Sequence, residues 1–304
     1  MTVFAPERPT TLELHEQHGL NGNPMPDAVE RMRQLVSSVI EHPGTGLVVG
    51  VGPCSMTLPV EEMLRESALL KNVSEATPGL ITLQRRNFWK PRTNPTDWHG
   101  PETTEPGEIF GKLLVGARTH GNGTAEVAKL RHVERYGRLL SLAWIGARND
   151  DIEEQIDMAQ YDPTLPFSIK NGLDGNIEKT LENIERIQSA RGLHSAPVFL
   201  LYRGGDNART PKDWAKEVRR AHELTGGKML IDLAHGGEQA HAIDGSFTKS
   251  KIGQLLCGVH AAKLAAEGIR PAGYLMESSN AESLTDPNLP LNIGIKLVGH
   301  LANA

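Results

Sequence analysis

Eight residues that can bind metals or anions, or carry protons, are spread along this 304-residue chain. Each stands at the end of a short apolar run or directly after it. They are Cys54, Arg85, Glu126, Arg148, Lys170, Arg203, His235 and Glu277. One polar residue in such a position means little, because many strands end in one. Eight of them, all charged or able to bind a metal, indicate a shared site.

The eight residues fall into groups with different chemistry. Four are cations that suit a ligand rich in phosphate and carboxylate oxygens: Arg85, Arg148, Lys170 and Arg203. Arginine makes bidentate contacts with such oxygens, and lysine presents a point charge to phosphate. Cys54, His235 and Glu277 offer sulfur, nitrogen and oxygen, a set that fits a first-row divalent metal. Each could alternatively be an ordinary buried or surface group, but their company with four cations favours a site.

The apolar runs themselves predict a parallel sheet. They cover Leu47–Gly52, Leu80–Leu83, Thr124–Val127, Leu142–Ile145, Pro166–Ile169, Val198–Tyr202, Met229–Leu233 and Gly273–Met276. Segments with helical spacing alternate with them: Val60–Leu70, Glu108–Val115, His132–Leu140, Asp151–Met158, Ile177–Ile187, Pro211–Leu224 and Lys251–Ala266. Near-continuous apolar strands that alternate with amphipathic helices are typical of a sheet covered by helices.

The number of strands decides between α/β folds. Eight strands close a (β/α)8 TIM barrel, whereas doubly wound sheets more often have fewer. The carboxyl ends of barrel strands face one mouth, so we expect the eight residues to share a rim. Ahead of the barrel, Asp27–Ile40 has the apolar stripe of an amphipathic helix. We therefore divide the chain into an arm and helix at 1–44 and a catalytic barrel at 45–304.

Composition limits the partners and the location. The net charge is −5 and the isoelectric point about 6.2. Nucleic acid and anionic membranes are therefore not expected as partners. The first residues lack the layout of a signal peptide, no uncharged apolar run reaches membrane length, and two distant cysteines suggest no disulfide framework. We expect a cytoplasmic protein.

Several short strings around these residues resemble type I DAHP synthase, 3-deoxy-7-phosphoheptulonate synthase. The strings are GPCS at 52–55, KPRT at 90–93, GAR at 146–148, KNGLDG at 170–175, RGG at 203–205, IDLAH at 231–235 and MES at 276–278. They occur in the family's order and extend over most of the chain. The resemblance implies a barrel enzyme that condenses phosphoenolpyruvate with erythrose 4-phosphate, releasing phosphate.

The resemblance also implies a role for each matching residue. The phosphoenolpyruvate ligands would be Arg85, Lys90, Arg148, Lys170 and Arg203, and Arg92 and Thr93 would bind the aldehyde's phosphate. Cys54, His235 and Glu277 would hold the metal, expected to be Mn²⁺, with Fe²⁺, Co²⁺ or Zn²⁺ also compatible. Lys90, Glu126, Lys170 and His235 would be the catalytic groups. A homodimer or homotetramer is the expected assembly.

Three departures from the family pattern limit the analogy. The family's fourth metal ligand, an aspartate, is absent; alignment places His300 there, with a histidine on a helix surface as the alternative. The segment between Arg148 and Lys170 is strongly acidic, which suits the acceptor's phosphate poorly. The link from Gly192 to Val198 is too short for the family's regulatory hairpin, which predicts an enzyme without feedback inhibition.

Two other functions are compatible with the sequence. Phosphoenolpyruvate could react with a different aldehyde in a specialised pathway, because the departures concentrate on the acceptor side. Alternatively, the missing aspartate could mark a catalytically impaired regulatory paralogue. Retention of five cations argues against the second alternative, since a scaffold has no need to hold like charges together.

Overall fold

The computed structural model describes residues 25–53, 60–86, 114, 117–205, 210–235, 251–280 and 289–304. Within them, eight parallel strands form a closed barrel in chain order. The strands are β1 (Leu47–Gly52), β2 (Leu80–Arg85), β3 (Gly123–Val127), β4 (Leu142–Ile145), β5 (Phe167–Lys170), β6 (Val198–Tyr202), β7 (Met229–Asp232) and β8 (Gly273–Glu277). Pairing of β1 with both β2 and β8 closes the ring, which confirms the predicted TIM barrel.

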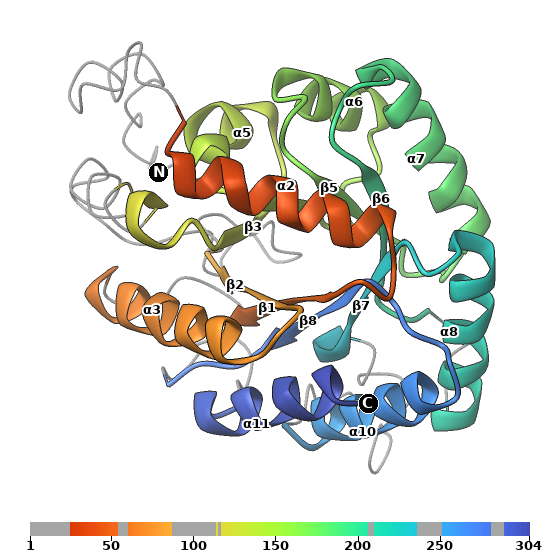
Figure 1. The fold of residues 1–304 in the computed structure, drawn as a ribbon. Helices are drawn as coiled ribbons and strands as arrows, with labels where there is room; N and C mark the ends of the chain where they lie inside the picture. The colour runs from red at the N-terminus through yellow and green to blue at the C-terminus, as the bar shows by residue number, and fades with distance from the viewer. Residues whose placement is uncertain are drawn as a thin grey trace, which may run out of the picture.

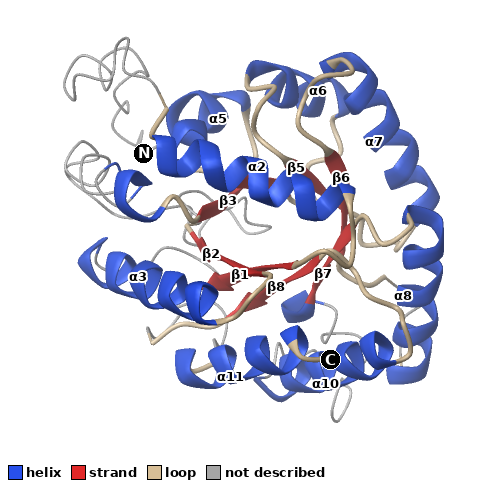
Figure 2. Ribbon diagram, in the orientation of Figure 1, coloured by secondary structure: helices blue, strands red, loops and turns tan. Residues whose placement is uncertain are grey.

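Helices surround the barrel on its outside (Figures 1 and 2). The described ones are α2 (Asp27–Glu41), α3 (Val60–Ala76), α5 (Leu130–Tyr136), α6 (Ile152–Tyr161), α7 (Ile177–Arg191), α8 (Pro211–Thr225), α10 (Lys251–Ala266) and α11 (Leu291–Ala302). A short 3-10 helix, η1 (Gly137–Leu139), follows α5. The helix predicted at Glu108–Val115 lies almost entirely outside the described residues. The helix α11 has no counterpart among the predicted elements.

Alternation along the strands divides the apolar core in two. Side chains such as Val48, Leu83 and Trp144 fill the inside of the barrel. Their neighbours, such as Val49 and Ile145, pack outward against the surrounding helices. Successive side chains of a strand point to opposite faces, so each barrel strand is apolar on both sides. This explains why the strands read as continuous apolar runs.

The helix α2 lies across one end of the barrel (Figure 1). Its apolar residues Val36, Val39 and Ile40 pack with the residues inside the barrel, so the helix closes that end. The buried guanidinium of Arg33 fixes it there. Arg33 donates from Nε to the carbonyl of Leu140 at 2.9 Å, and its Nη1 lies 3.0 Å from Asp162 Oδ2. The predicted amphipathic helix is confirmed, and its stripe covers the barrel floor.

Side-chain caps set the amino-terminal ends of α7 and α8. The side chain of Asn176 accepts a hydrogen bond from the backbone N–H of Lys179, and Thr210 accepts one from Asp213. Gly226, in a left-handed conformation with φ 61°, ends α8. Among the described residues, no helix is long and apolar enough to cross a membrane.

Candidate active site

The described site residues lie at the carboxyl ends of the strands, as predicted. Arg85, Lys170 and Glu277 are the last residues of β2, β5 and β8, and Glu126 is the penultimate residue of β3. The other described candidates, Arg148, Arg203 and His235, follow β4, β6 and β7 within three residues. Cys54, Lys90, Arg92 and Thr93 lie outside the described residues, so their predicted roles stay predictions.

Arg85 and Glu277 meet across an intervening strand. Neither β2 nor β8 pairs with the other, because β1 lies between them. The two side chains still approach to 3.4 Å between Arg85 Nη2 and Glu277 Oε1. Gly52, on the intervening strand, packs closely on Arg85, since a Cβ there would lie only 3.0 Å from the Cβ, N and O atoms of Arg85. The guanidinium also stands over the ring of Trp144, 5.3 Å from its centroid.

A second charged group joins β5 to β7. Lys170 Nζ lies 2.7 Å from Asp232 Oδ2, and His235 Nδ1 lies 2.9 Å from the same oxygen. The other carboxylate oxygen accepts the backbone N–H groups of Ala234 and His235, both at 3.1 Å. Burial alone would raise the pKa of Asp232, but contacts with His235 and Lys170 hold it well below its ordinary value. Asp232 is therefore a buried, ionised link between two predicted catalytic groups.

The same surroundings set the charge of His235. Burial lowers the pKa of His235 to about 4, although the neighbouring Asp232 acts in the opposite direction. The imidazole is then neutral near pH 7, and its Nδ1 lies 2.9 Å from Asp232 Oδ2. A neutral imidazole can offer a ring nitrogen to a metal ion. A carboxylate that orients a histidine through the other ring nitrogen is the usual support of a metal-binding histidine.

Two further contacts fix neighbouring groups of the rim. Glu126 is 8% exposed, and a Cβ on Gly146 would collide with its carboxylate. The amide of Asn171 accepts the backbone N–H of Arg203 at 2.8 Å and donates to the carbonyl of Gly204 at 2.8 Å. The KNGLDG and RGG strings are thus joined, which places Lys170 and Arg203 at adjacent positions of the rim. Arg148, by contrast, is exposed in the turn after β4.

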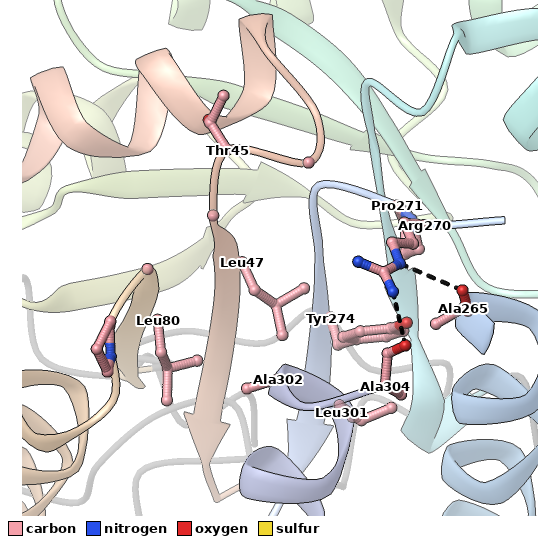
Figure 3. A pocket seen from close by; sticks show the side chains of 14 residues that line it. Thr45, Leu47, Leu80, Ala265, Arg270, Pro271, Tyr274, Leu301, Ala302 and Ala304 are labelled. Carbon is pink, nitrogen blue, oxygen red and sulfur yellow. Dashed lines mark hydrogen bonds between the residues drawn. The ribbon is translucent and has the colours of Figure 1, made fainter. Parts of the chain in front are cut away.

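The structure does not bring His300 to this site. His300 is exposed in the last turn of α11. Ala302, two residues on, lines a cavity of about 200 Å³ with Leu47 and Leu80, the first residues of β1 and β2 (Figure 3). His300 therefore stands at the amino-terminal end of the barrel, whereas Glu277 ends β8 at the opposite side. This position, exposed on a helix, agrees with the alternative of a histidine on a helix surface, and a role of His300 as the fourth metal ligand stays a prediction.

The acidic segment between Arg148 and Lys170 contains the helix α6, on the outside of the barrel. Three of its carboxylates form ion pairs, one of which joins Asp162 to Arg33. Glu153 Oε1 lies 3.3 Å from Arg186 Nη2, and Glu154 Oε2 lies 2.6 Å from Lys129 Nζ. Because these three carboxylates are paired with cations, the segment opposes an acceptor phosphate less than its composition suggests.

Three functional residues were missed by sequence reasoning: Asp232, Asn171 and Gln254. The first two lie inside quoted strings, next to or near a predicted catalytic residue, so the strings already contained the signal. Gln254 on α10 accepts from the backbone N–H of Glu277 at 3.0 Å and donates to its carbonyl at 3.3 Å. No motif marks Gln254, because it binds only the backbone of Glu277, a residue 23 positions further along the chain.

Comparison with known proteins decides the family. A model described as the DAHP synthetase I family matches residues 28–286. The chain belongs to this family. The match contains every described site residue at the barrel mouth and stops short of His300. The resemblance drawn from the short strings is confirmed.

Individual relatives of this DAHP synthase family member cover nearly the whole chain. The Trp-sensitive phospho-2-dehydro-3-deoxyheptonate aldolase of Buchnera aphidicola is 27% identical, over 97% of this chain and 94% of that protein. The phospho-2-dehydro-3-deoxyheptonate aldolase of Corynebacterium glutamicum is 23% identical, over 89% and 79%. The solved aldolase of Francisella tularensis has a TM-score of 0.78 at 15% identity, over 99% and 98% of the two chains. At that identity the structural likeness shows the fold alone.

Proposed function

We propose that this chain is a metal-dependent enzyme that condenses phosphoenolpyruvate with erythrose 4-phosphate to give DAHP and phosphate. The observation that carries the proposal is the linked group Lys170, Asp232 and His235 at the mouth of a barrel of this family. The group puts an ion-paired ammonium beside a neutral imidazole. A cation for an anionic substrate and a nitrogen ligand for a metal ion therefore lie on the same rim.

The cations of the rim would hold phosphoenolpyruvate. Arg85 is 3% exposed and Lys170 8%, so both charges act where water screens them little. Arg203 and the exposed Arg148 supply further contacts on the neighbouring strands, with Lys90 as a fifth cation by resemblance. Fixed cations around the phosphate and carboxylate orient the enol carbon and stabilise the charge that shifts during reaction. Arg92 and Thr93 would bind the phosphate of the aldehyde.

The residues present fit a divalent metal. His235 and Glu277 follow or end the adjacent strands β7 and β8, and Cys54 follows β1, which pairs with β8. Three donors of nitrogen, oxygen and sulfur thus come from three consecutive strands, a set that suits Mn²⁺ and also accepts Fe²⁺, Co²⁺ or Zn²⁺. When bound, such an ion would polarise the aldehyde carbonyl as a Lewis acid. Asp232 would keep the imidazole oriented toward it.

The reaction forms one carbon–carbon bond and breaks one bond to phosphate. The enol carbon of phosphoenolpyruvate attacks the aldehyde carbon, and water adds to the cationic carbon that remains. Inorganic phosphate then leaves, and a ketone results. Glu126, buried at the rim beside Gly146, is placed to accept or return a proton during these steps.

One assay separates this proposal from its alternatives. Metal-free protein is mixed with phosphoenolpyruvate and erythrose 4-phosphate, Mn²⁺ is added, and phosphate release and product mass are measured. A seven-carbon product supports the proposal. Binding of phosphoenolpyruvate without turnover, rescued by another aldehyde, supports a different acceptor. Absence of any metal-dependent binding leaves a regulatory paralogue.

The two cysteines provide a matched pair for the metal assignment. Cys54→Ala should abolish metal-dependent turnover, whereas Cys257→Ala should not, because Cys257 is buried on α10 within the core. Equal activity of the two variants would contradict the assignment of Cys54.

Three further properties belong to the proposal. We place the enzyme in the cytoplasm, as a homodimer or homotetramer. We also propose that it lacks feedback inhibition. The structure has α7 ending at Arg191 and β6 starting at Val198, so the connection is as short as predicted. Tight binding of Phe, Tyr or Trp with loss of activity, measured by calorimetry and assay, would contradict this.

A further inference from the structure

A buried group of polar side chains lies behind the active site, on the outer face of the barrel wall. Arg85 points into the barrel, so its chain neighbours Gln84 and Arg86 point outward. They meet Glu66 and Ser67, two consecutive residues of α3. All four of these outer side chains are buried, with at most 2% exposed.

Glu66 binds the segment that follows Glu277. Its Oε1 accepts the hydroxyl of Ser279 at 2.9 Å and the backbone N–H of Asn280 at 3.0 Å. Ser278, which lies between Glu277 and Ser279, donates its backbone N–H to the carbonyl of Gly52 at 3.0 Å. The chain directly beyond the last residue of β8 is thus held on both sides.

Ser67 binds the end of β2 in the same way. Its hydroxyl accepts from Arg86 Nη2 at 3.2 Å, and Arg86 Nε donates to Gln84 Oε1 at 3.3 Å. The side chain and carbonyl of Ser67 are both hydrogen-bonded to Asn122, just before β3. One turn of α3 therefore holds β8 and β2 from outside, and these strands carry the Glu277 and Arg85 that meet inside.

Keeping a carboxylate in this position is costly. Burial raises the pKa of Glu66, although hydrogen bonds from Asn280 and Ser279 work against it. An apolar residue would fill the space without the desolvation cost. The partners of Glu66 indicate what the carboxylate does, because two of them belong to the chain that leaves the active site.

We propose that Glu66 is a positioning residue that fixes the chain after β8 and so the carboxylate of Glu277 against Arg85. The proposal rests on the proposed function, in which these two residues bind the metal and phosphoenolpyruvate. Its action passes through the backbone of Ser279 and Asn280, so Glu66 itself touches no substrate.

The test compares Glu66→Ala, which removes the acceptor, with Glu66→Gln, which keeps the accepting oxygen. Glu75→Ala is the control, since Glu75 is exposed at the end of the same helix. Hydrogen exchange of the Asn280 amide, Mn²⁺ affinity by calorimetry and the KM for phosphoenolpyruvate are measured on protein shown to be folded. The exchange measurement needs no substrate.

We expect Glu66→Ala to speed exchange at Asn280 and to weaken Mn²⁺ binding and raise KM by about 10-fold, as for other supports of metal ligands. Glu66→Gln should restore these values to within about threefold of the wild type, a rescue that a purely structural role would not give. Unchanged Mn²⁺ affinity and KM in folded Glu66→Ala would overturn the proposal, as would an equal loss in Glu66→Gln. If the wild type binds no phosphoenolpyruvate, the proposed function fails, while exchange at Asn280 still decides whether Glu66 holds this chain.

Discussion

Lys170 Nζ lies 2.7 Å from Asp232 Oδ2, an oxygen that also lies 2.9 Å from His235 Nδ1. One buried carboxylate thus serves a group proposed to bind phosphoenolpyruvate and a group proposed to bind the metal. Its charge keeps the ammonium in place and faces the imidazole. Substrate binding and metal binding should therefore depend on the same side chain.

Replacing Asp232 by Asn should impair both functions. The amide keeps the shape but loses the charge that Lys170 and His235 share. We expect Mn²⁺ affinity to fall by about 10- to 100-fold, with a higher KM for phosphoenolpyruvate. Calorimetry and initial rates measure the two effects, and Asp157→Asn on the exposed side of α6 is the control. Loss of only one of the two affinities would show that Asp232 does not couple them.

Gly146→Ala should disturb Glu126 without changing any charge. The added methyl group would occupy the space of the Glu126 carboxylate. Overpacking of this kind costs about 1–3 kcal/mol. Because ~1.4 kcal/mol corresponds to a tenfold change, we expect kcat/KM to fall about 10-fold or more. Gly299→Ala is the matched control, since a Cβ there meets no atom within 4 Å, and normal kinetics of Gly146→Ala would disprove the crowding.

The two histidines should behave differently on replacement. His235→Ala removes a nitrogen donor from the barrel mouth, so we expect Mn²⁺ affinity to fall ~100-fold or more. His300→Ala changes an exposed side chain at the far end of α11, so metal affinity and turnover should stay at the wild-type level. Both are measured by metal titration of the metal-free protein. A large loss in His300→Ala would identify it as a ligand.

Arg33→Ala should destabilise the protein without entering the active site. Arg33 is 3% exposed and holds α2 to Leu140, Gly137 and Asp162. Breaking a buried ion pair by removing one partner costs about 3–5 kcal/mol. Urea unfolding should report this loss, with Arg31→Ala on the exposed face of α2 as the control. Equal stability of the two variants would show that Arg33 does not anchor the helix.

The sequence determined the barrel and the end of the barrel at which the candidate site lies. A strand buried on both faces is apolar throughout, so the sequence shows where it begins and ends. Eight such strands that alternate with helices indicate a closed barrel. The carboxyl ends of the strands then place Arg85, Lys170, His235 and Glu277 on one rim. None of this requires knowledge of how side chains pack.

Only the tertiary structure decided which side chains meet. The contact of Arg85 with Glu277 crosses β1, and no local pattern in the sequence specifies it. His300 aligned with a ligand position, yet the helical rise of α11 carries it to the opposite end of the barrel. Asp232 and Glu66 looked like ordinary acids, because their roles come from partners on distant elements. Hydrogen bonds and ion pairs depend on distances of tenths of an ångström, and these are fixed only when the whole barrel closes.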